Sequence, residues 1–316
     1  FKYTPYDQVL TSKLVDVVKF EKLDLLHVHY AIPHASAAYM AQQILLDQNI
    51  KIPFITTLHG TDITLVGKDP SFEPVINFSI NHSNSVTAVS KSLKKETEKL
   101  FKVQKKINVI PNFICTQDYQ LVNNDFYKKR FAPNNEKIIC HISNFRKVKR
   151  IQDVLAAFEI ISKKIAVKLI LVGDGPERSS LERLSRESVY SNHIHYIGSL
   201  KSTKEVLNIS DIFFLPSLTE SFGLSALEAM ACSVPVISTK TGGIPEVVVH
   251  GESGMLSNVG DFKNMANNAL KMLSNEDQLN KFKANALKQA QKFDVKKILP
   301  LYEKLYEDCI EVHFNK

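Results

Sequence analysis

Short apolar runs alternate with stretches of helical periodicity from one end of the chain to the other. This alternation is typical of α/β proteins, in which a parallel strand is followed by a helix that packs on the sheet. A first series of buried strands is predicted at residues 23–29, 54–58, 85–89 and 107–110. A second series is predicted at residues 137–142, 166–172, 193–197, 211–215 and 234–238. The pattern therefore indicates two parallel sheets.

Helical patterns lie between these runs and continue after the last of them. The clearest ones between strands are residues 36–46, 92–101, 151–163 and 225–232. After Gly260 the strands end, and helices are predicted at residues 262–274, 276–292 and 295–312. A helical tail of this kind often packs back across a domain junction, which we expect here.

A polar segment at residues 115–136 separates the two series of strands. It carries Asn123-Asn124-Asp125 and Pro133-Asn134-Asn135, and such clusters mark loops and linkers. We therefore predict a first domain at residues 1–133, with the C-terminal helix at 295–316 packing on it, and a second domain at 134–294. The first domain opens with a helix-like pattern at 9–20 rather than a strand and a glycine-rich turn, so we expect it to lack its first βα units.

Composition and charge narrow the classes of function. The chain has 316 residues, long enough for two domains, and a net charge of +7. Its basic residues are dispersed, so we expect anionic small-molecule substrates and no nucleic acid. No apolar run approaches the ~20 residues that cross a bilayer, and no signal peptide is visible. These features predict a cytoplasmic protein without stable membrane insertion; the oligomeric state is left open, a homodimer included.

Several common catalytic motifs are missing. The four cysteines are too widely spaced for a zinc knuckle or a CxxC motif and are expected to be reduced. There is no Asp-x-Asp to hold a catalytic divalent metal, so no metal is expected. Gly-x-Ser-x-Gly and Walker-type motifs are also missing, which disfavours an α/β-hydrolase or a P-loop enzyme.

Two glutamates follow the predicted strand at 211–215, in the stretch Glu220-Ser-Phe-Gly-Leu-Ser-Ala-Leu-Glu228. Glu220 is expected at the carboxyl end of a strand, where open α/β sheets bind ligands. The amides of residues 222–224 would lie at a helix N-terminus, which suits phosphate or sugar oxygens. Glu228, about two turns along, could accept hydrogen bonds from a ribose diol. Taken alone, such a pair is more often two solvated helix carboxylates.

Three strand-end loops of the second half add candidate chemistry. Ser143-Asn-Phe-Arg146-Lys-Val-Lys149-Arg150 concentrates cations that could neutralise a diphosphate, although a solvated basic loop explains it equally well. Thr241-Gly-Gly-Ile-Pro-Glu246 is a strand-to-helix turn with helix amides available to anions. Gly173-Asp-Gly-Pro176 is also such a turn, for which a structural role is the stronger interpretation.

Histidines mark two strand ends in the first half. His59 follows the strand at 54–58, and His27-Val-His29-Tyr30 ends the preceding one. Because the carboxyl ends of neighbouring parallel strands share one rim of a sheet, we expect these histidines to be close together. A functional and a structural role are equally consistent with this placement.

The order of these motifs resembles a known family. Asn-Phe-Arg-Lys-x-Lys, Gly-Asp-Gly-Pro, Glu-x7-Glu and Gly-Gly-Ile-Pro-Glu follow one another at residues 144–149, 173–176, 220–228 and 242–246, as in the donor half of family 4 retaining GT-B glycosyltransferases. The resemblance covers essentially the whole chain. Residues 27–35, 57–64 and 141–150 are most similar to those members that join N-acetylglucosamine from UDP-N-acetylglucosamine to L-malate, the first step of bacillithiol synthesis. It implies two Rossmann-like domains that face a central cleft.

The resemblance also implies a role for each matching residue. Lys149 and Arg146 would hold the diphosphate, and Glu228 the ribose hydroxyls. Many members carry Arg five residues before the matching Lys, where this chain has Asn144, so we expect Arg146 to supply that charge. Of the other residues, Glu220 and the amides of Phe222, Gly223 and Leu224 would contact the donor sugar and phosphate, His59 would lie near the sugar 6-hydroxyl, and Tyr30 and Thr61 are acceptor-pocket candidates.

The implied reaction is metal-independent transfer with retention, in which UDP-N-acetylglucosamine is a co-substrate and no cofactor takes part. A β-phosphate oxygen of the donor would act as the base. Two alternatives stay open: a family 4 transferase with a lipid-linked or polysaccharide acceptor, and a non-catalytic relative that binds UDP-sugars. A GT-B epimerase is disfavoured by the Glu-x7-Glu spacing.

Overall fold

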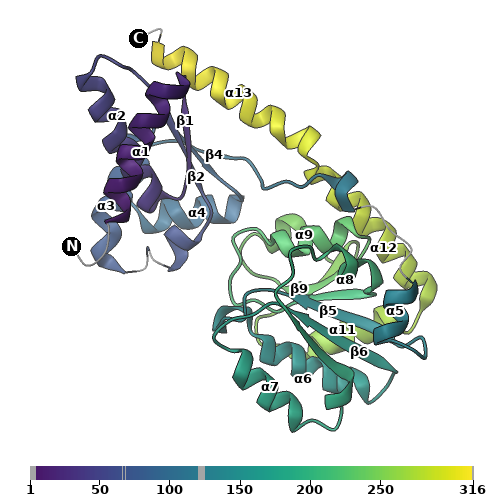
Figure 1. Ribbon diagram of the computed structural model, residues 1–316. Coiled ribbons are helices and arrows are strands. Elements are labelled where there is room, and N and C mark those ends of the chain that lie inside the picture. Colours follow the sequence, from purple (N-terminus) through teal and green to yellow (C-terminus); the bar gives the residue numbers. More distant parts are fainter. Residues whose placement is uncertain (1–4, 66, 68, 120–124, 315–316) are drawn as a thin grey trace. The chain divides into compact units, whose positions relative to one another are not determined.

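The computed structural model describes residues 5–65, 67, 69–119 and 125–314. The chain divides into two compact units: unit 1 comprises Phe1–Asn112 and Lys296–Lys316, and unit 2 comprises Phe113–Val295. Each unit has one parallel sheet with helices between the strands, as Figure 1 shows. The predicted α/β fold with two Rossmann-like domains is confirmed.

Unit 1 is built on a four-stranded sheet in which each strand pairs with the next one along the chain. The strands are β1 (Leu26–His29), β2 (Phe54–Leu58), β3 (Ser85–Ala88) and β4 (Ile107–Val109). The helices are α1 (Tyr6–Glu21), α2 (Ser36–Asp47), α3 (Glu73–His82), α4 (Lys91–Leu100) and α13 (Val295–Phe314). The single turn η1 (Ala31–Ala35) follows β1, η2 (Thr61–Leu65) follows β2, and η4 (Pro70–Phe72) directly precedes α3.

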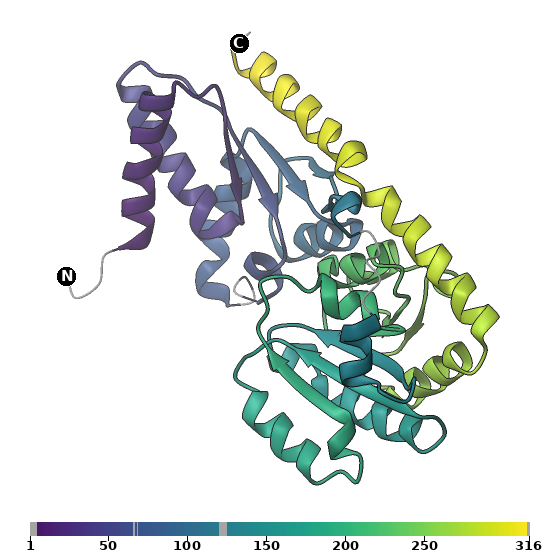
Figure 2. The same cartoon turned by 45° about the vertical axis from the view of Figure 1, so that its right-hand side comes forward.

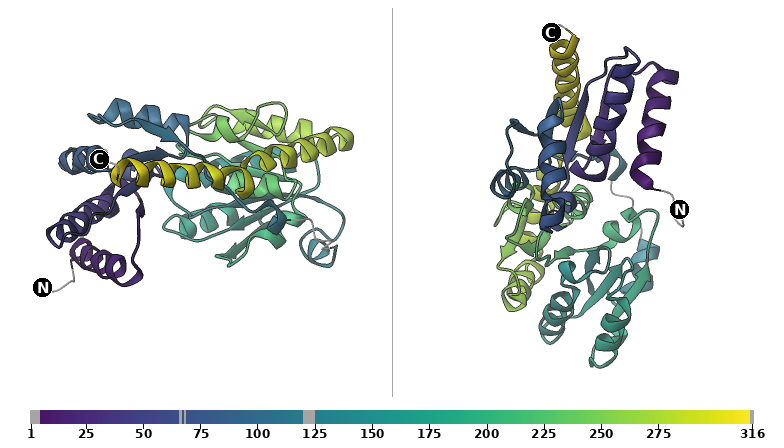
Figure 3. Two further views of the ribbon diagram at one scale, coloured as in Figure 1. Left: turned by 90° about the horizontal axis from the view of Figure 1, so that it is seen from above. Right: turned by 90° about the vertical axis from the view of Figure 1, so that its left-hand side faces the viewer.

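Small and apolar side chains form the core of unit 1. α1 and α2 run side by side, as the views in Figures 2 and 3 show. Ala38, Ala41 and Leu45 of α2 are fully buried and pack with Phe54 of β2, because alanines let the helix approach the sheet closely. α13 joins this unit through Ile298 and other side chains that pack on the end of β4.

Unit 2 has a six-stranded sheet in the order β10-β9-β8-β5-β6-β7. The strands are β5 (Lys137–Ile142), β6 (Val167–Val172), β7 (Ile194–Gly198), β8 (Ile212–Leu215), β9 (Val236–Thr239) and β10 (Gly254–Ser257). The chain winds outward from β5 to β7, returns beside β5 as β8, and winds outward again. This is the doubly wound Rossmann order, whose switch point lies between β5 and β8.

Helices cover the sheet of unit 2. They are α5 (Asp125–Phe131), α6 (Ile151–Ser162), α7 (Arg178–Arg186), α8 (Lys204–Ile209), α9 (Leu224–Ala231), α10 (Ile244–Val247), α11 (Phe262–Leu273) and α12 (Glu276–Ala290), with single turns η5 (Thr116–Tyr119), η6 (Lys147–Lys149), η7 (Ser191–His193) and η8 (Gln291–Phe293). β8 is buried along its whole length, which explains its uninterrupted apolar sequence. The side chains of Asp261 and Asn275 cap α11 and α12, so both helices begin where a capping residue stands.

The predicted linker at 115–136 needs correction. The division between the units falls at Asn112 and Phe113, and η5 and α5 belong to unit 2. Ile114 pairs with Asp294 in a β-bridge, and α5 packs on α8, so long-range contacts bind this polar segment to unit 2. Residues 120–124 of the predicted linker lie outside the described residues. At the other end of the chain, residues from Lys296 onward belong to unit 1.

None of the helices in the described ranges combines the length and the apolar character that a membrane span requires.

Candidate functional site

The loops that follow β5 and β8 meet at the switch point of unit 2. Parallel strands that diverge in this way leave a crevice at their carboxyl ends, where ligands bind. The amide of Leu218, after β8, donates to the carbonyl of Val148, after β5, at 2.8 Å. This bond ties the two loops together at the rim of the sheet.

A cation and a carboxylate face each other across this rim. Lys149 lies at the end of η6 and forms an ion pair with Oε1 of Glu220. Ser217 Oγ donates a second hydrogen bond to the same oxygen at 3.0 Å. The side chains of Lys149 and Glu220 are only 20% and 14% exposed, so the pair is partly shielded from water. The structure thus brings together two residues that the sequence predicted to share a site.

Arg146 lies in the same loop, three residues before Lys149. Its backbone precedes η6 and accepts the amide of Lys149, but its side chain is exposed and has no ion pair with any described acidic residue. It is available to an anion without belonging to the Lys149–Glu220 pair. Arg150, which follows, is committed to Asp153, with contacts of 2.7 and 3.1 Å.

The Gly173-Asp-Gly-Pro176 turn packs against the loop after β5, which carries Lys149. A Cβ at Gly173 would lie 1.8 Å from the carbonyl oxygen of Ser143, and one at Gly175 would lie 2.7 Å from backbone atoms of Phe145. The amide of Phe145 donates to the carbonyl of Asp174 at 2.8 Å. Backbone therefore packs on backbone, and these glycines position the loop that carries Lys149.

A second glycine turn holds the Glu220 loop. The amide of Gly243 donates to the carbonyl of Glu220 at 2.8 Å. A Cβ at Gly242 would lie 1.9 Å from that carbonyl oxygen, and one at Gly243 would lie 2.2 Å from the carbonyl oxygen of Ser221. The close approach requires glycine at both positions. The Thr241–Glu246 motif thus has a structural reason in addition to any contact with a ligand.

This contact gives a testable pair of variants. Gly242 and Gly251 both have positive φ, 52° and 82°, but nothing lies within 4 Å of a Cβ at Gly251. Alanine at either site costs about 1 kcal/mol for the left-handed backbone. Gly242→Ala also displaces the Glu220 backbone, and we expect it to cost a further ~2 kcal/mol or more and to lower activity over tenfold. Denaturant unfolding and rate measurements on both variants check this. Equal losses of stability and activity in the two variants would show that the contact of residue 242 with the Glu220 carbonyl is unimportant.

The helix α9 begins directly after the Glu220 loop. Gly223 is its N-cap, with φ of 94°, and a Cβ there would lie 2.4 Å from Ile244 Cδ1. The side chain of Phe222 is buried in an edge-to-face contact with Phe293, so only its backbone is available to a ligand. Leu224 is the first helical residue and is partly exposed. The predicted N-terminal amides therefore belong to a real helix start.

Glu228 lies within α9 and is not a solvated surface carboxylate. Burial raises its pKa, and a hydrogen bond from the Tyr119 hydroxyl opposes that rise. Tyr119 stands at the end of η5, and burial and the nearby Glu228 raise its own pKa. The ammonium of Lys204 lies 5.2 Å from the centre of the Tyr119 ring. Tyr119 was not predicted from the sequence, because its segment has the polar composition of a linker.

Tyr30 and Thr61 share a cavity in unit 1. The cavity has a volume of about 500 Å³, and its lining includes Tyr30, His34, Ser36 and Thr61. Tyr30 has φ of 78°, a conformation that costs a residue other than glycine ~1–3 kcal/mol and is typical of functional sites. The structure therefore brings the two predicted acceptor residues to one hollow.

A buried aspartate organises the loops around that cavity. Asp62 accepts the amide of Ala31 at 2.7 Å and the amide of Gly60 at 3.0 Å. Burial raises the pKa of Asp62, and its backbone hydrogen bonds oppose the rise. It joins the loop after β1 to the loop after β2. The sequence contained this residue in the Leu58–Asp62 motif but gave no sign of its role.

His59 lies among other aromatic rings at the end of β2. Its Nε2 is 2.7 Å from Nδ1 of His29, and its ring centre is 5.2 Å from that of Tyr30. Burial, with a smaller contribution from His29, lowers the pKa of His59 to about 4. The two strand-end histidines are thus close together, as predicted, and His59 is neutral at pH 7.

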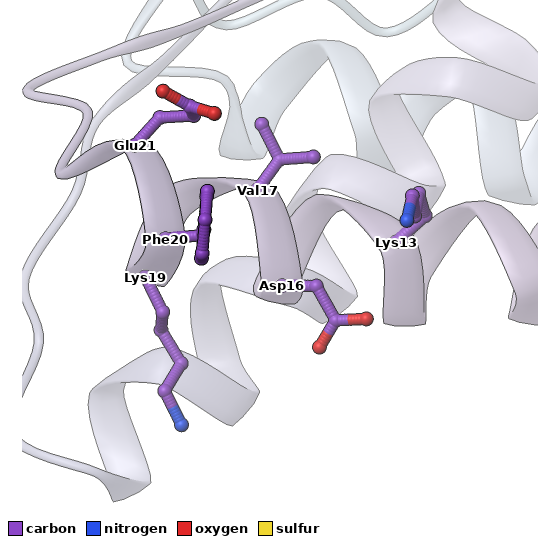
Figure 4. A pocket seen from close by; sticks show the side chains of 6 residues that line it. All are labelled: Lys13, Asp16, Val17, Lys19, Phe20 and Glu21. Atoms are coloured by element: carbon purple, nitrogen blue, oxygen red, sulfur yellow. The ribbon is translucent and has the colours of Figure 1, made fainter.

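A second depression, on the surface of α1, lacks the features of a functional site. A depression of about 580 Å³ follows α1, and the residues that line it are shown in Figure 4. All of them project from one helix, so no second element supplies a converging group. No group of three or more His, Cys, Asp or Glu side chains suited to a metal ion occurs in the part of the chain that the structure describes.

Comparisons with known proteins match both parts of the chain to glycosyltransferases. The family model of Glycosyl transferases group 1 matches residues 123–289, and that of Glycosyltransferase Family 4 matches residues 1–118. The chain is 45% identical over 312 residues to N-acetyl-alpha-D-glucosaminyl L-malate synthase of Bacillus anthracis, covering 98% of this chain and 81% of that protein.

Solved structures with the same fold are more distant in sequence. Sucrose-phosphate synthase of Thermosynechococcus elongatus superposes with a TM-score of 0.80 at 21% identity, covering 98% of this chain and 81% of that one. Anabaena HepE in complex with UDP and glucose superposes with a TM-score of 0.79 at 23% identity, covering 93% and 80%. With the group 1 match extending over more than half of the sequence and a relative at 45% identity, the chain belongs to the group 1 glycosyl transferases and is a glycosyltransferase.

Proposed function

We propose that this glycosyltransferase moves N-acetylglucosamine from UDP-N-acetylglucosamine to the hydroxyl of L-malate, with retention at the anomeric carbon. The observation that carries the proposal is the Lys149–Glu220 pair at the switch point of unit 2, in a chain that is 45% identical to N-acetyl-alpha-D-glucosaminyl L-malate synthase over nearly its full length. This is the first step of bacillithiol synthesis.

The donor groups are assigned to unit 2. Lys149, assisted by Arg146, binds the diphosphate, since both are cations at the carboxyl ends of the strands. Glu220 and the amides at the start of α9 contact the donor sugar and phosphate. Glu228 accepts hydrogen bonds from the ribose hydroxyls, since a carboxylate has acceptor sites beyond the one hydrogen bond from Tyr119.

The acceptor groups are assigned to unit 1. The cavity offers the hydroxyl groups of Tyr30, Ser36 and Thr61, which can hydrogen-bond a small polar acid, and its lining also includes Asp7, Asp62 and apolar side chains. His59 is assigned to the 6-hydroxyl of the reacting sugar. Its low pKa keeps the ring uncharged, which suits a position beside a sugar that becomes positively charged in the transition state.

The reaction needs no protein nucleophile. The bond between the anomeric carbon and the β-phosphate oxygen breaks, and negative charge accumulates on the departing UDP. Lys149, Arg146 and the helix amides stabilise that charge. The malate hydroxyl attacks the same face of the sugar, forms the new glycosidic bond and gives its proton to a β-phosphate oxygen of UDP.

We also propose that no divalent metal takes part, because cationic side chains and helix amides neutralise the diphosphate. The rate of transfer should be unchanged, within about twofold, after treatment with EDTA and gel filtration. Adding Mg²⁺ or Mn²⁺ should not increase it. A loss of more than tenfold that either metal restores would contradict this part of the proposal.

The identity of the acceptor is tested by offering the protein different candidate acceptors, each with the same amount of UDP-N-acetylglucosamine. We expect product with L-malate, and little with D-malate, succinate or glycerol, because succinate lacks the hydroxyl and D-malate presents it in the opposite configuration. Mass spectrometry of the products checks this. Transfer to a lipid-linked or polysaccharide sugar in preference to L-malate would favour the alternative acceptor class, and donor binding without any transfer would indicate a non-catalytic relative.

We propose a cytoplasmic location for the enzyme. All four cysteines are free thiols, and three of them are buried, which is consistent with a reducing compartment.

A further inference from the structure

The two histidines at the strand ends of unit 1 are coupled directly. β1 and β2 are parallel, and His29 of β1 is paired with Thr57 of β2. His59 follows Thr57 by two residues, so it lies just beyond the end of β2. Nδ1 of His29 and Nε2 of His59 are 2.7 Å apart, and the ring centres are 4.9 Å apart. That distance is a hydrogen bond between two ring nitrogens.

Such a bond ties the protonation of one ring to that of the other. Burial lowers the pKa of His29 as well as that of His59, so both rings are neutral at pH 7. Two facing nitrogens of neutral imidazoles share one proton, because two N–H groups would clash and two lone pairs would form no bond. The tautomer of His59 is therefore set by the tautomer of His29.

His29 is itself held in place from several sides. Its carbonyl accepts a hydrogen bond from Nδ1 of His34, and its ring lies 4.7 Å from that of His27. His27 is fully committed, because its two nitrogens are each 2.7 Å from a hydroxyl, that of Tyr306 and that of Thr57. His27 is thus an anchor to α13, whereas His29 is the ring that reaches His59.

The bond also leaves one nitrogen of His59 available. Nδ1 of His59 has no hydrogen-bond partner among the described residues, and Nε2 is occupied by His29. The carboxylate in the vicinity, Asp62, accepts backbone amides and does not bond to either ring. The ring of Tyr30 contacts His59, and the ring of His27 contacts His29.

We infer that His29 is a positioning residue for the transfer: it fixes the ring orientation and the tautomer of His59, so that Nδ1 of His59 faces the donor sugar. The inference rests on the proposed function, in which His59 lies beside the reacting sugar. His29 touches no reacting atom in this account. It acts through His59 alone.

Three variants test the inference. His29→Phe keeps a ring against His27 but removes the nitrogen, and His29→Asn keeps a polar atom near the position of Nδ1. We expect His29→Phe to lower kcat about 10- to 100-fold, as small misplacements of catalytic groups do, with KM for UDP-N-acetylglucosamine changed less than threefold. His29→Asn should recover most of the loss. The control is His82→Phe: His82 is an exposed histidine of the same unit that stacks on Phe78, and its loss should change neither constant.

A spectroscopic readout separates positioning from general stability. Nitrogen-15 NMR of the ring nitrogens distinguishes the tautomers, and the His59 signals should indicate one tautomer in the wild type and in His29→Asn, and a mixture in His29→Phe. Wild-type kcat in His29→Phe, or unchanged His59 signals, would overturn the inference. So would equal losses of kcat in the two His29 variants. Because the NMR measurement needs no acceptor, it decides the inference even if L-malate proves to be the wrong acceptor.

Discussion

Lys149→Ala is expected to lower kcat by about a thousandfold, because in the proposed function Lys149 is the cation that stabilises charge on the departing diphosphate. Loss of a single neutral donor to a developing anion costs ~100- to 1,000-fold in other enzymes, and an ammonium in a partly shielded site belongs at the upper end of that range. The variant also leaves the Glu220 carboxylate without its ion-pair partner, so a negative charge then faces the diphosphate.

The effect is distinguishable from unfolding. Ser217 still donates to Glu220 in the variant, and the loop is held by the Leu218–Val148 hydrogen bond, so we expect the fold to survive. Lys147→Ala is the matched control, since Lys147 lies in the same turn with an exposed side chain. It should keep activity within about threefold. Circular dichroism confirms the fold, and near-normal turnover by Lys149→Ala would remove this residue from the diphosphate role.

The second large effect is expected on binding. Glu228→Ala should weaken the affinity for UDP by about 10- to 100-fold, since hydrogen bonds to a charged group contribute ~1.5–3 kcal/mol. Isothermal titration calorimetry measures this, with Glu187→Ala as the control, because Glu187 is an exposed glutamate at the end of α7. Unchanged affinity in Glu228→Ala would exclude the ribose assignment.

The same residue predicts a pH dependence. Burial raises the pKa of Glu228, so the carboxylate becomes protonated at a higher pH than an exposed glutamate does. The acid form loses acceptor capacity, and UDP affinity should therefore fall as the pH is lowered toward that raised pKa. Tyr119→Phe removes the hydrogen bond that opposes the rise, and we expect the fall to begin at a still higher pH. A fall at the same pH in both proteins would show that Tyr119 does not support Glu228.

Much of the fold follows from local patterns. Buried parallel strands such as β8 are apolar runs, and helices such as α11 and α12 begin at capping residues, so both kinds of element are visible in a sequence. The three C-terminal helices were predicted with ends within two residues of those observed, at 262–273, 276–290 and 295–314. β10 was missed because it is a short edge strand that begins with a glycine and ends with a serine.

Long-range contacts explain what the sequence could not reveal. The segment that begins at Phe113 belongs to unit 2, where Ile114 forms a bridge with Asp294, a residue far away in the chain. The partner of Glu228 is Tyr119, which stands in a polar segment without any motif. By contrast, the family resemblance implied that Lys149 and Glu220 belong to one donor site, and the structure brings the two side chains together at the switch point of the sheet.

Proton NMR can follow the reaction of the protein with UDP-N-acetylglucosamine and L-malate and so test the proposed transfer. We expect one UDP to be released for each N-acetylglucosamine joined to malate, and the anomeric proton of the product to have the small coupling constant of an α-glycoside, as in the donor. A β-glycoside would contradict retention. Release of UDP with free N-acetylglucosamine as the sole sugar product would contradict transfer to L-malate.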